Sequence, residues 1–136
     1  MIKLDIYSDS ICPWCYIGKS YLDRALEINS NNILANLSKG IWHAEIINQA
    51  GKTVAKAVYG AKVNNAIEHF EIVQNQKESK EIGVLYELAY GYSLLNEDIY
   101  LNKSKILIKE LLELSPLSDM DTLYIKKSLS LLEILP

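Results

Sequence analysis

The stretch "LANLSKGIWHAEIINQAGKTVAKAVYG", residues 34–60, contains the pattern that decides the fold. Its apolar and small residues recur at steps of three and four, which places them on one face of an α-helix. These residues are Leu34, Leu37, Ile41, Ala44, Ile47, Gly51, Val54 and Val58, and Gly60 closes the series. The stretch therefore predicts one long helix, with a bend expected at Gly40 or Gly51.

The same helical period continues to the C-terminus. It predicts helices at about 62–76, 80–95, 100–114 and 119–135, with breaks at "NED" (96–98) and at Pro116. Upstream, Pro13 suits the first position of a helix that ends near "NSNN", residues 29–32. Only the first residues alternate with period two, at Ile2, Leu4 and Ile6, which predicts one short strand. The expected fold class is all-α, preceded by a strand-turn-helix segment.

A repeat of 38 residues relates two of the predicted helix pairs. Ile47, Ala50, Gly51, Val54, Asn64, Ala66, Phe70 and Val73 recur as Leu85, Leu88, Ala89, Tyr92, Asn102, Ser104, Ile108 and Leu111. This spacing of large and small residues resembles a tetratricopeptide repeat with a slightly longer turn, over about residues 31–136. The resemblance implies TPR-like helical hairpins that bury their faces by stacking on one another. An ordinary helical bundle is the alternative.

Charge and hydropathy exclude some partners. The chain has 14 Lys and Arg against 17 Asp and Glu, with no basic run, so we expect no nucleic-acid partner. No apolar run reaches the roughly 18 residues of a membrane span, and the N-terminus does not resemble a signal peptide. We therefore expect a cytoplasmic protein that does not bind membranes.

The two cysteines of the chain lie in "ICPWCYIGK", residues 11–19. In a cytoplasmic protein such a pair is more often catalytic or metal-binding than a structural disulfide. Residues 1–27, "MIKLDIYSDSICPWCYIGKSYLDRALE", resemble the start of the DsbA-like thioredoxin superfamily. The similar branch includes 2-hydroxychromene-2-carboxylate isomerases and DsbA-type oxidoreductases. The resemblance implies thiol–disulfide exchange, tuned by Pro13 and Trp14.

The position of Cys12 before the predicted helix assigns the two thiols different roles. Backbone N–H groups and the helix dipole at an N-cap stabilise a thiolate and lower its pKa. Cys12 is therefore the expected nucleophile, and Cys15, one turn into the helix, is the expected resolving thiol.

Zinc binding is the main rival use of the two thiols. Tetrahedral zinc needs two more ligands, and only His43 and His69 are available, on different predicted helices and without paired spacing. We therefore expect both histidines to be half-buried packing residues and expect no metal site. No glycine-rich phosphate loop or Ser-His-Asp arrangement is present, so we expect no cofactor and no other enzyme class.

The chain departs from the DsbA-like pattern after its first helix. The family faces its dithiol with a cis-proline loop, but Pro116 ends a predicted helix and Pro136 is the last residue. We therefore divide the chain into a DsbA-like segment at 1–28 and a TPR-like domain at 31–136. Residues 21–32, "YLDRALEINSNN", fit either part, so a genuine fusion and a disrupted reading frame both stay open.

Two functions follow from these parts. The favoured interpretation is a protein-interaction scaffold whose inner face binds an acidic or amidic peptide through Asn48, Lys52, Lys56, Tyr86 and Tyr90. A short array with an apolar end would also allow a homodimer. The alternative is a thiol–disulfide oxidoreductase that uses Cys12 and Cys15.

Overall fold

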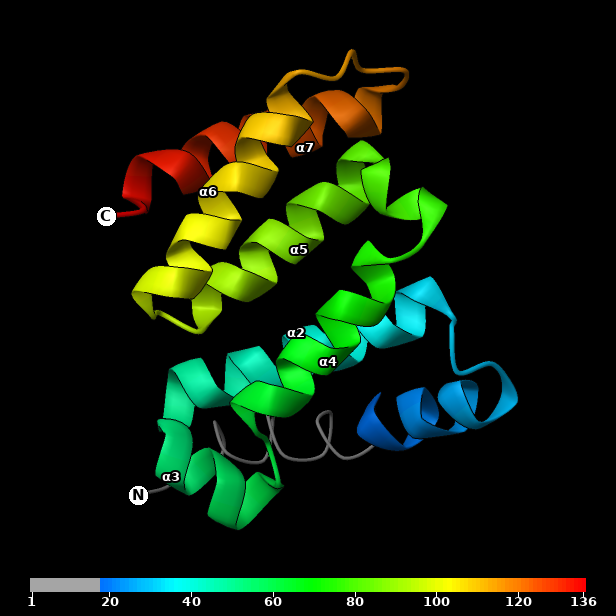
Figure 1. The fold of residues 1–136 in the computed structure, drawn as a ribbon, viewed down its shortest axis with the longest axis vertical. Coiled ribbons are helices and arrows are strands. Elements are labelled where there is room, and N and C mark those ends of the chain that lie inside the picture. The colour runs from blue at the N-terminus through cyan, green and yellow to red at the C-terminus, as the bar shows by residue number, and fades with distance from the viewer. Residues whose placement is uncertain (1–17) are drawn as a thin grey trace, which may run out of the picture.

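The computed structural model describes residues 18–136 and is helical throughout (Figure 1). Residues 18–28 form a helix, and no strand occurs among the described residues. The expected all-α fold is therefore confirmed, whereas the predicted strand at residues 2–7 lies outside the described residues. The elements that follow are α2 (Ile33–Ala50), α3 (Lys52–Val54), the π-helix η1 (Ala55–Tyr59), α4 (Val63–Gln74), the 3-10 helix η2 (Lys77–Lys80), α5 (Ile82–Leu94), α6 (Asp98–Leu112) and α7 (Asp119–Ile134).

Polar caps and glycines set the limits of the first long helix. Asn32 is the N-cap of α2, and its side-chain Oδ1 accepts a hydrogen bond from Ala35 N at 2.9 Å. Gly51, with φ +80°, ends α2, and Gly60, with φ +68°, ends η1. The predicted bend is therefore at Gly51. Because the chain turns there, the last part of the predicted apolar face is wrong, and Val54 and Val58 are exposed.

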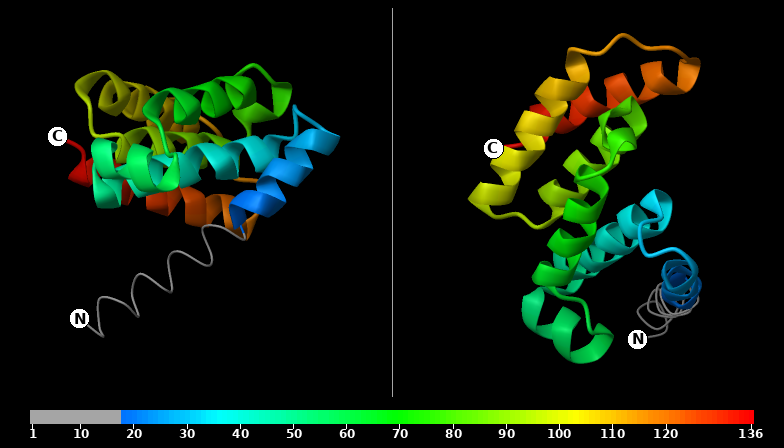
Figure 2. Two further views of the ribbon diagram at one scale, coloured as in Figure 1. Left: turned by 90° about the horizontal axis from the view of Figure 1, so that it is seen from below. Right: turned by 45° about the vertical axis from the view of Figure 1, so that its right-hand side comes forward.

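The helices pack as two antiparallel pairs with α7 added. α2 packs against α4, α5 packs against α6, and the two pairs meet mainly where α2 contacts α5. α7 packs on α5 and α6 at the end of the molecule opposite residues 18–28 (Figures 1 and 2). No helix within residues 18–136 is long and apolar enough to cross a bilayer.

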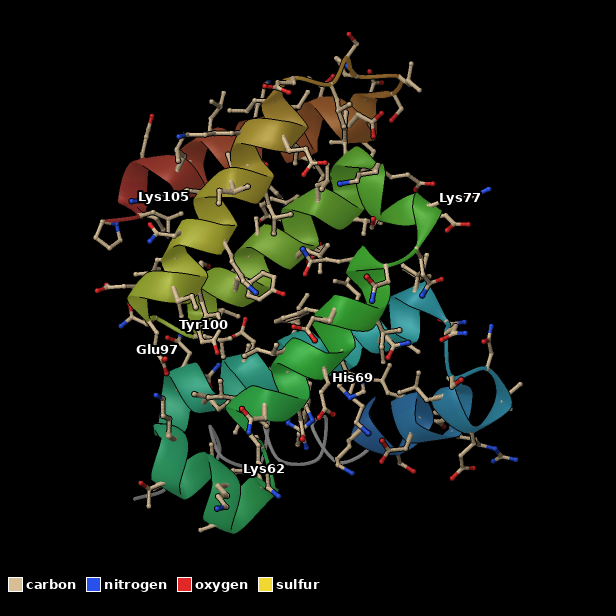
Figure 3. The ribbon with its side chains drawn as sticks, viewed as in Figure 1. Lys62, His69, Lys77, Glu97, Tyr100 and Lys105 are labelled. Atoms are coloured by element: carbon tan, nitrogen blue, oxygen red, sulfur yellow. The ribbon has the colours of Figure 1, made fainter. Side chains whose placement is uncertain are left out.

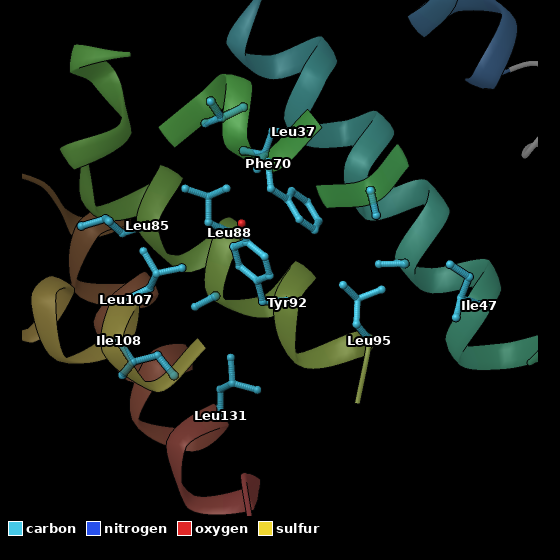
Figure 4. Packing of buried hydrophobic residues seen from close by; sticks show 14 of the residues in the cluster. Leu37, Ile47, Phe70, Leu85, Leu88, Tyr92, Leu95, Leu107, Ile108 and Leu131 are labelled. Atoms are coloured by element: carbon cyan, nitrogen blue, oxygen red, sulfur yellow. The ribbon is translucent and has the colours of Figure 1, made fainter. Parts of the chain in front are cut away.

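Phe70 lies at the centre of the contact between the two pairs (Figure 4). Its ring is fully buried and lies 4.9 Å from the ring of Tyr92, measured between centroids. A methyl group added to Gly40 or Gly91 would lie 2.5 or 2.4 Å from a carbon of this ring. These glycines therefore allow α2 and α5 to approach α4 closely, and a larger residue at either position would require the ring to move.

The 38-residue register holds for the second helix of each pair but not for the first. Ala66 and Ser104 are both buried at helix–helix contacts. Ser104 Oγ donates to Ala89 O at 2.7 Å, whereas Ala66 O lies 3.2 Å from the Cβ position of Gly40. Ser104 thus contacts the first helix of its pair at Ala89, and Ala66 contacts the first helix of its pair at Gly40. Gly40 is therefore the residue equivalent to Ala89 in the repeat, and the predicted equivalence of Gly51 is wrong. The reason is that residues 51–62, with α3 and η1, separate α2 from α4, whereas only residues 95–97 separate α5 from α6.

Candidate functional site

The predicted dithiol lies outside the described residues. Cys12, Pro13, Trp14 and Cys15 belong to residues 1–17. Their roles as nucleophile, tuning residues and resolving thiol therefore stay predictions from the sequence.

The two tyrosines predicted for a binding face do lie together. The rings of Tyr86 and Tyr90 stack with centroids 6.2 Å apart, and Tyr86 also lies 5.4 Å from the ring of Tyr124 in α7. The hydroxyl of Tyr90 donates to a carboxylate oxygen of Glu45 in α2. Both tyrosines are half-buried and pack against the core, so they connect α5 to its neighbours on both sides.

The predicted polar members of that face lie elsewhere. Lys52 forms an ion pair with Glu97, and Asn48 is exposed near the end of α2. Lys52 and Lys56 line a hollow of about 220 Å³, and neither tyrosine lines it. The structure thus separates the predicted residues into a tyrosine cluster and a lysine-lined hollow. Their roles in partner binding stay predictions.

A polar cleft of about 1070 Å³ lies between the helix of residues 18–28, α2, α4 and the end of η1 with Gly60. His69 borders this cleft from α4 (Figure 3). Charged and polar side chains predominate among the lining residues, which are Lys19, Ser20, Asp23, Arg24, Glu27, Lys39, His43, Val58, Tyr59, Gly60, Asn65, Glu68 and His69.

His43 and His69 stack at the inner wall of the cleft. Their ring centroids lie 6.0 Å apart, and the ring planes differ by 15°. His43 is only 2% exposed, and its Nδ1 accepts a hydrogen bond from the backbone N–H of Lys62 at 3.2 Å. This bond assigns the proton of neutral His43 to Nε2.

His69 has the opposite hydrogen-bond arrangement. Asn36 Nδ2 donates to the carbonyls of Ser30 and Asn32, each at 2.9 Å, so Asn36 Oδ1 is left as an acceptor. His69 Nδ1 lies 2.9 Å from this oxygen and therefore donates to it. The neutral His69 ring therefore carries its lone pair on Nε2.

The surroundings favour the neutral form of both rings. Burial lowers the pKa of His43 to about 4, and the positive charges of His69 and nearby lysines act in the same direction. Burial and Lys39 also lower the pKa of His69, against an opposing effect of Glu68. Asp23 binds two of the lysines, Lys19 at 2.8 Å and Lys39 by a second ion pair.

His69 is half-buried as predicted and His43 is more deeply buried than predicted, but their pairing was not predicted. They come from different helices, and no spacing rule in the sequence indicates that α2 and α4 bring them together. Within residues 18–136, no group of three or more His, Cys, Asp and Glu side chains is arranged to hold a metal ion.

Comparison with known proteins assigns the family. The sequence profile of the DSBA-like thioredoxin domain matches residues 3–84, which include both cysteines and the residues that form α2, α3, η1 and α4. No curated protein and no solved structure gives a significant match. Because the matched region is more than half of the 136-residue chain, the protein belongs to the DSBA-like thioredoxin domain family.

Proposed function

We propose that this protein is a thiol–disulfide oxidoreductase, with Cys12 as the nucleophile and Cys15 as the resolving thiol. The observation that supports this most is the Cys-Pro-Trp-Cys sequence at 12–15 within the range matched by the DSBA-like family. A thiol three residues before another, at the start of a predicted helix, is the arrangement in which one thiolate is activated and the other lies within reach.

The exchange proceeds in two displacements. The Cys12 thiolate attacks one sulfur of a substrate disulfide, a mixed disulfide forms, and the other substrate sulfur leaves as a thiolate with the electron pair of the broken bond. The Cys15 thiolate then attacks Cys12 Sγ and releases the second substrate thiolate. The substrate disulfide gains two electrons, and the Cys12–Cys15 dithiol loses two as it becomes a disulfide.

Trapping of the mixed disulfide tests this proposal. A Cys15→Ser variant lacks the resolving thiol, so the reduced protein should accumulate a mixed disulfide at Cys12 when it is mixed with oxidised glutathione or a disulfide peptide. Mass spectrometry of the intact protein measures this adduct. The Cys12→Ser variant is the matched control and should form much less adduct at Cys15. Equal adduct formation by the two variants would contradict the assigned roles.

A TPR-like scaffold that binds a peptide is the second candidate. The stacking of the α2–α4 and α5–α6 pairs supports it, because stacked helical pairs are the form in which such repeats present a binding face. Lys52 and Lys56 beside their shared hollow favour an acidic or amidic segment. Both lysines are exposed, and Lys52 is the one that forms an ion pair with Glu97.

A peptide titration tests the second candidate. Fluorescence anisotropy with a labelled hexaglutamate peptide measures binding by the wild-type protein and by Lys56→Glu. The charge reversal should weaken binding at least tenfold, whereas Lys126→Glu, on the exposed side of α7, should leave it unchanged. Equal losses in both variants would mean that only net charge matters and would contradict a site at Lys56.

A further inference from the structure

We propose that the cleft between residues 18–28, α2 and α4 is a binding site for an oxyanion, a carboxylate or phosphate group, held by Lys39, Lys19 and the histidine pair. The residues that carry this proposal belong to the described part of the chain and do not include Cys12 or Cys15, and the inference does not depend on the proposed oxidoreductase activity.

The first argument is the hydrogen bonding of the two rings. Lys62 N–H occupies Nδ1 of His43, and Asn36 Oδ1 occupies Nδ1 of His69. In both residues, therefore, Nε2 is the ring nitrogen left for a ligand in the cleft. His43 Nε2 already has a hydrogen to donate, and His69 Nε2 becomes a donor when it takes up a proton. Two such donors match the acceptor oxygens of a carboxylate or phosphate.

The second argument is the balance of charge around the rings. Lys19 and Lys39 share one carboxylate, that of Asp23, so this group of three side chains has one positive charge in excess. The Lys39 side chain is 16% exposed and faces the same cleft as both histidines. Arg24, Glu27 and Glu68 also line the cleft, and Glu68 opposes the lysines only at His69. The three cationic and three acidic side chains of the lining balance formally, but the lysines act as positive charges on His43, and this local field favours an anion there.

The third argument is that anion binding and protonation would support each other. Burial and then the charge of Lys39 lower the pKa of His69, while Glu68 raises it, and a bound anion would offset the effect of Lys39. By linkage, an anion that raises the pKa of His69 must bind more tightly at a pH where this ring is protonated. Binding coupled to one proton changes the dissociation constant by up to about tenfold per pH unit.

The experiment uses sulfate, because it remains a dianion between pH 5.5 and 7.5. The chain has two histidines, so NMR of the full-length protein shows two sets of imidazole signals, and a His43→Asn variant assigns them. At constant ionic strength set with chloride, sulfate should shift the His69 signals saturably, raise the pKa of His69 and bind more tightly at pH 5.5 than at pH 7.5. Phenyl phosphate and succinate, compared at pH 7.0, then distinguish a phosphate from a carboxylate ligand.

Variants separate a specific site from general screening. Lys39→Met should weaken sulfate binding at least fivefold, Lys39→Arg should restore most of it, and Lys126→Met on α7 should leave it unchanged. His69→Asn keeps a donor for Asn36 Oδ1 but lacks Nε2, so it should remove the pH dependence of binding. The proposal is overturned if none of the three anions gives a saturable shift, or if Lys126→Met reduces binding as much as Lys39→Met.

Discussion

Replacement of His43 by Asn should reduce the sensitivity of this protein to mild acid. The pKa of His43 is lowered from 6.5 to about 4 in the folded protein, so the unfolded chain binds more protons between these two values. The contribution of neutral His43 is fully present above pH 6.5 and is lost as the pH falls toward 4. For these values the contribution of His43 to the free energy of unfolding falls by about 2 kcal/mol between pH 7 and pH 5.

The substitution preserves the local hydrogen bond while it removes the titrating ring. Asn Oδ1 takes the position of His43 Nδ1 and can still accept from Lys62 N–H. Urea unfolding at pH 7 and pH 5, followed by circular dichroism at 222 nm, measures the difference. We expect wild-type protein to lose about 2 kcal/mol more than His43→Asn over this range. Equal losses in the two proteins would refute the account of His43 as a buried neutral residue.

Two further substitutions test the packing. Gly91→Ala would place a methyl group 2.4 Å from Phe70 Cζ, so urea unfolding should show that the free energy of unfolding falls by about 1–3 kcal/mol. The control is Gly18→Ala, whose methyl group meets no atom within 4 Å. This variant should have the same stability as the wild type or be slightly more stable. Equal stability of the two variants would contradict the close contact between α4 and α5. Tyr90→Phe removes the hydroxyl that donates to Glu45, and urea unfolding should show that the free energy of unfolding falls by about 1 kcal/mol. The control Tyr21→Phe, at an exposed position, should have no effect.

The helical fold could be predicted from the sequence because its period is strong and its breaks are chemically distinct. Pro116 and the "NED" turn separate α5, α6 and α7 close to where the sequence predicts. The register of the first repeat was wrong because residues 34–60 keep an apolar period across Gly51, although the chain turns at that residue. Periodicity detects which faces are apolar, but it cannot show that a positive φ interrupts the helix.

The candidate site was less predictable because it depends on contacts between helices. The sequence predicts that His43 and His69 are half-buried, but their stacking follows from the packing of α2 against α4. Tyr86 and Tyr90 lie side by side because they are four residues apart on one helix, and their role in partner binding stays a prediction. Lys52 and Lys56 were placed with them by the repeat register, which does not hold for the first helix of the pair.

Disulfide reduction by the full-length protein is the most direct test of the proposed function. The initial rate of insulin disulfide reduction, with dithiothreitol as the electron donor, should rise in proportion to the concentration of wild-type protein. The Cys12→Ser variant should give only the rate of dithiothreitol alone, because it lacks the attacking thiolate. If the wild-type protein also gives no more than that background rate, the dithiol does not catalyse exchange and the oxidoreductase proposal is contradicted.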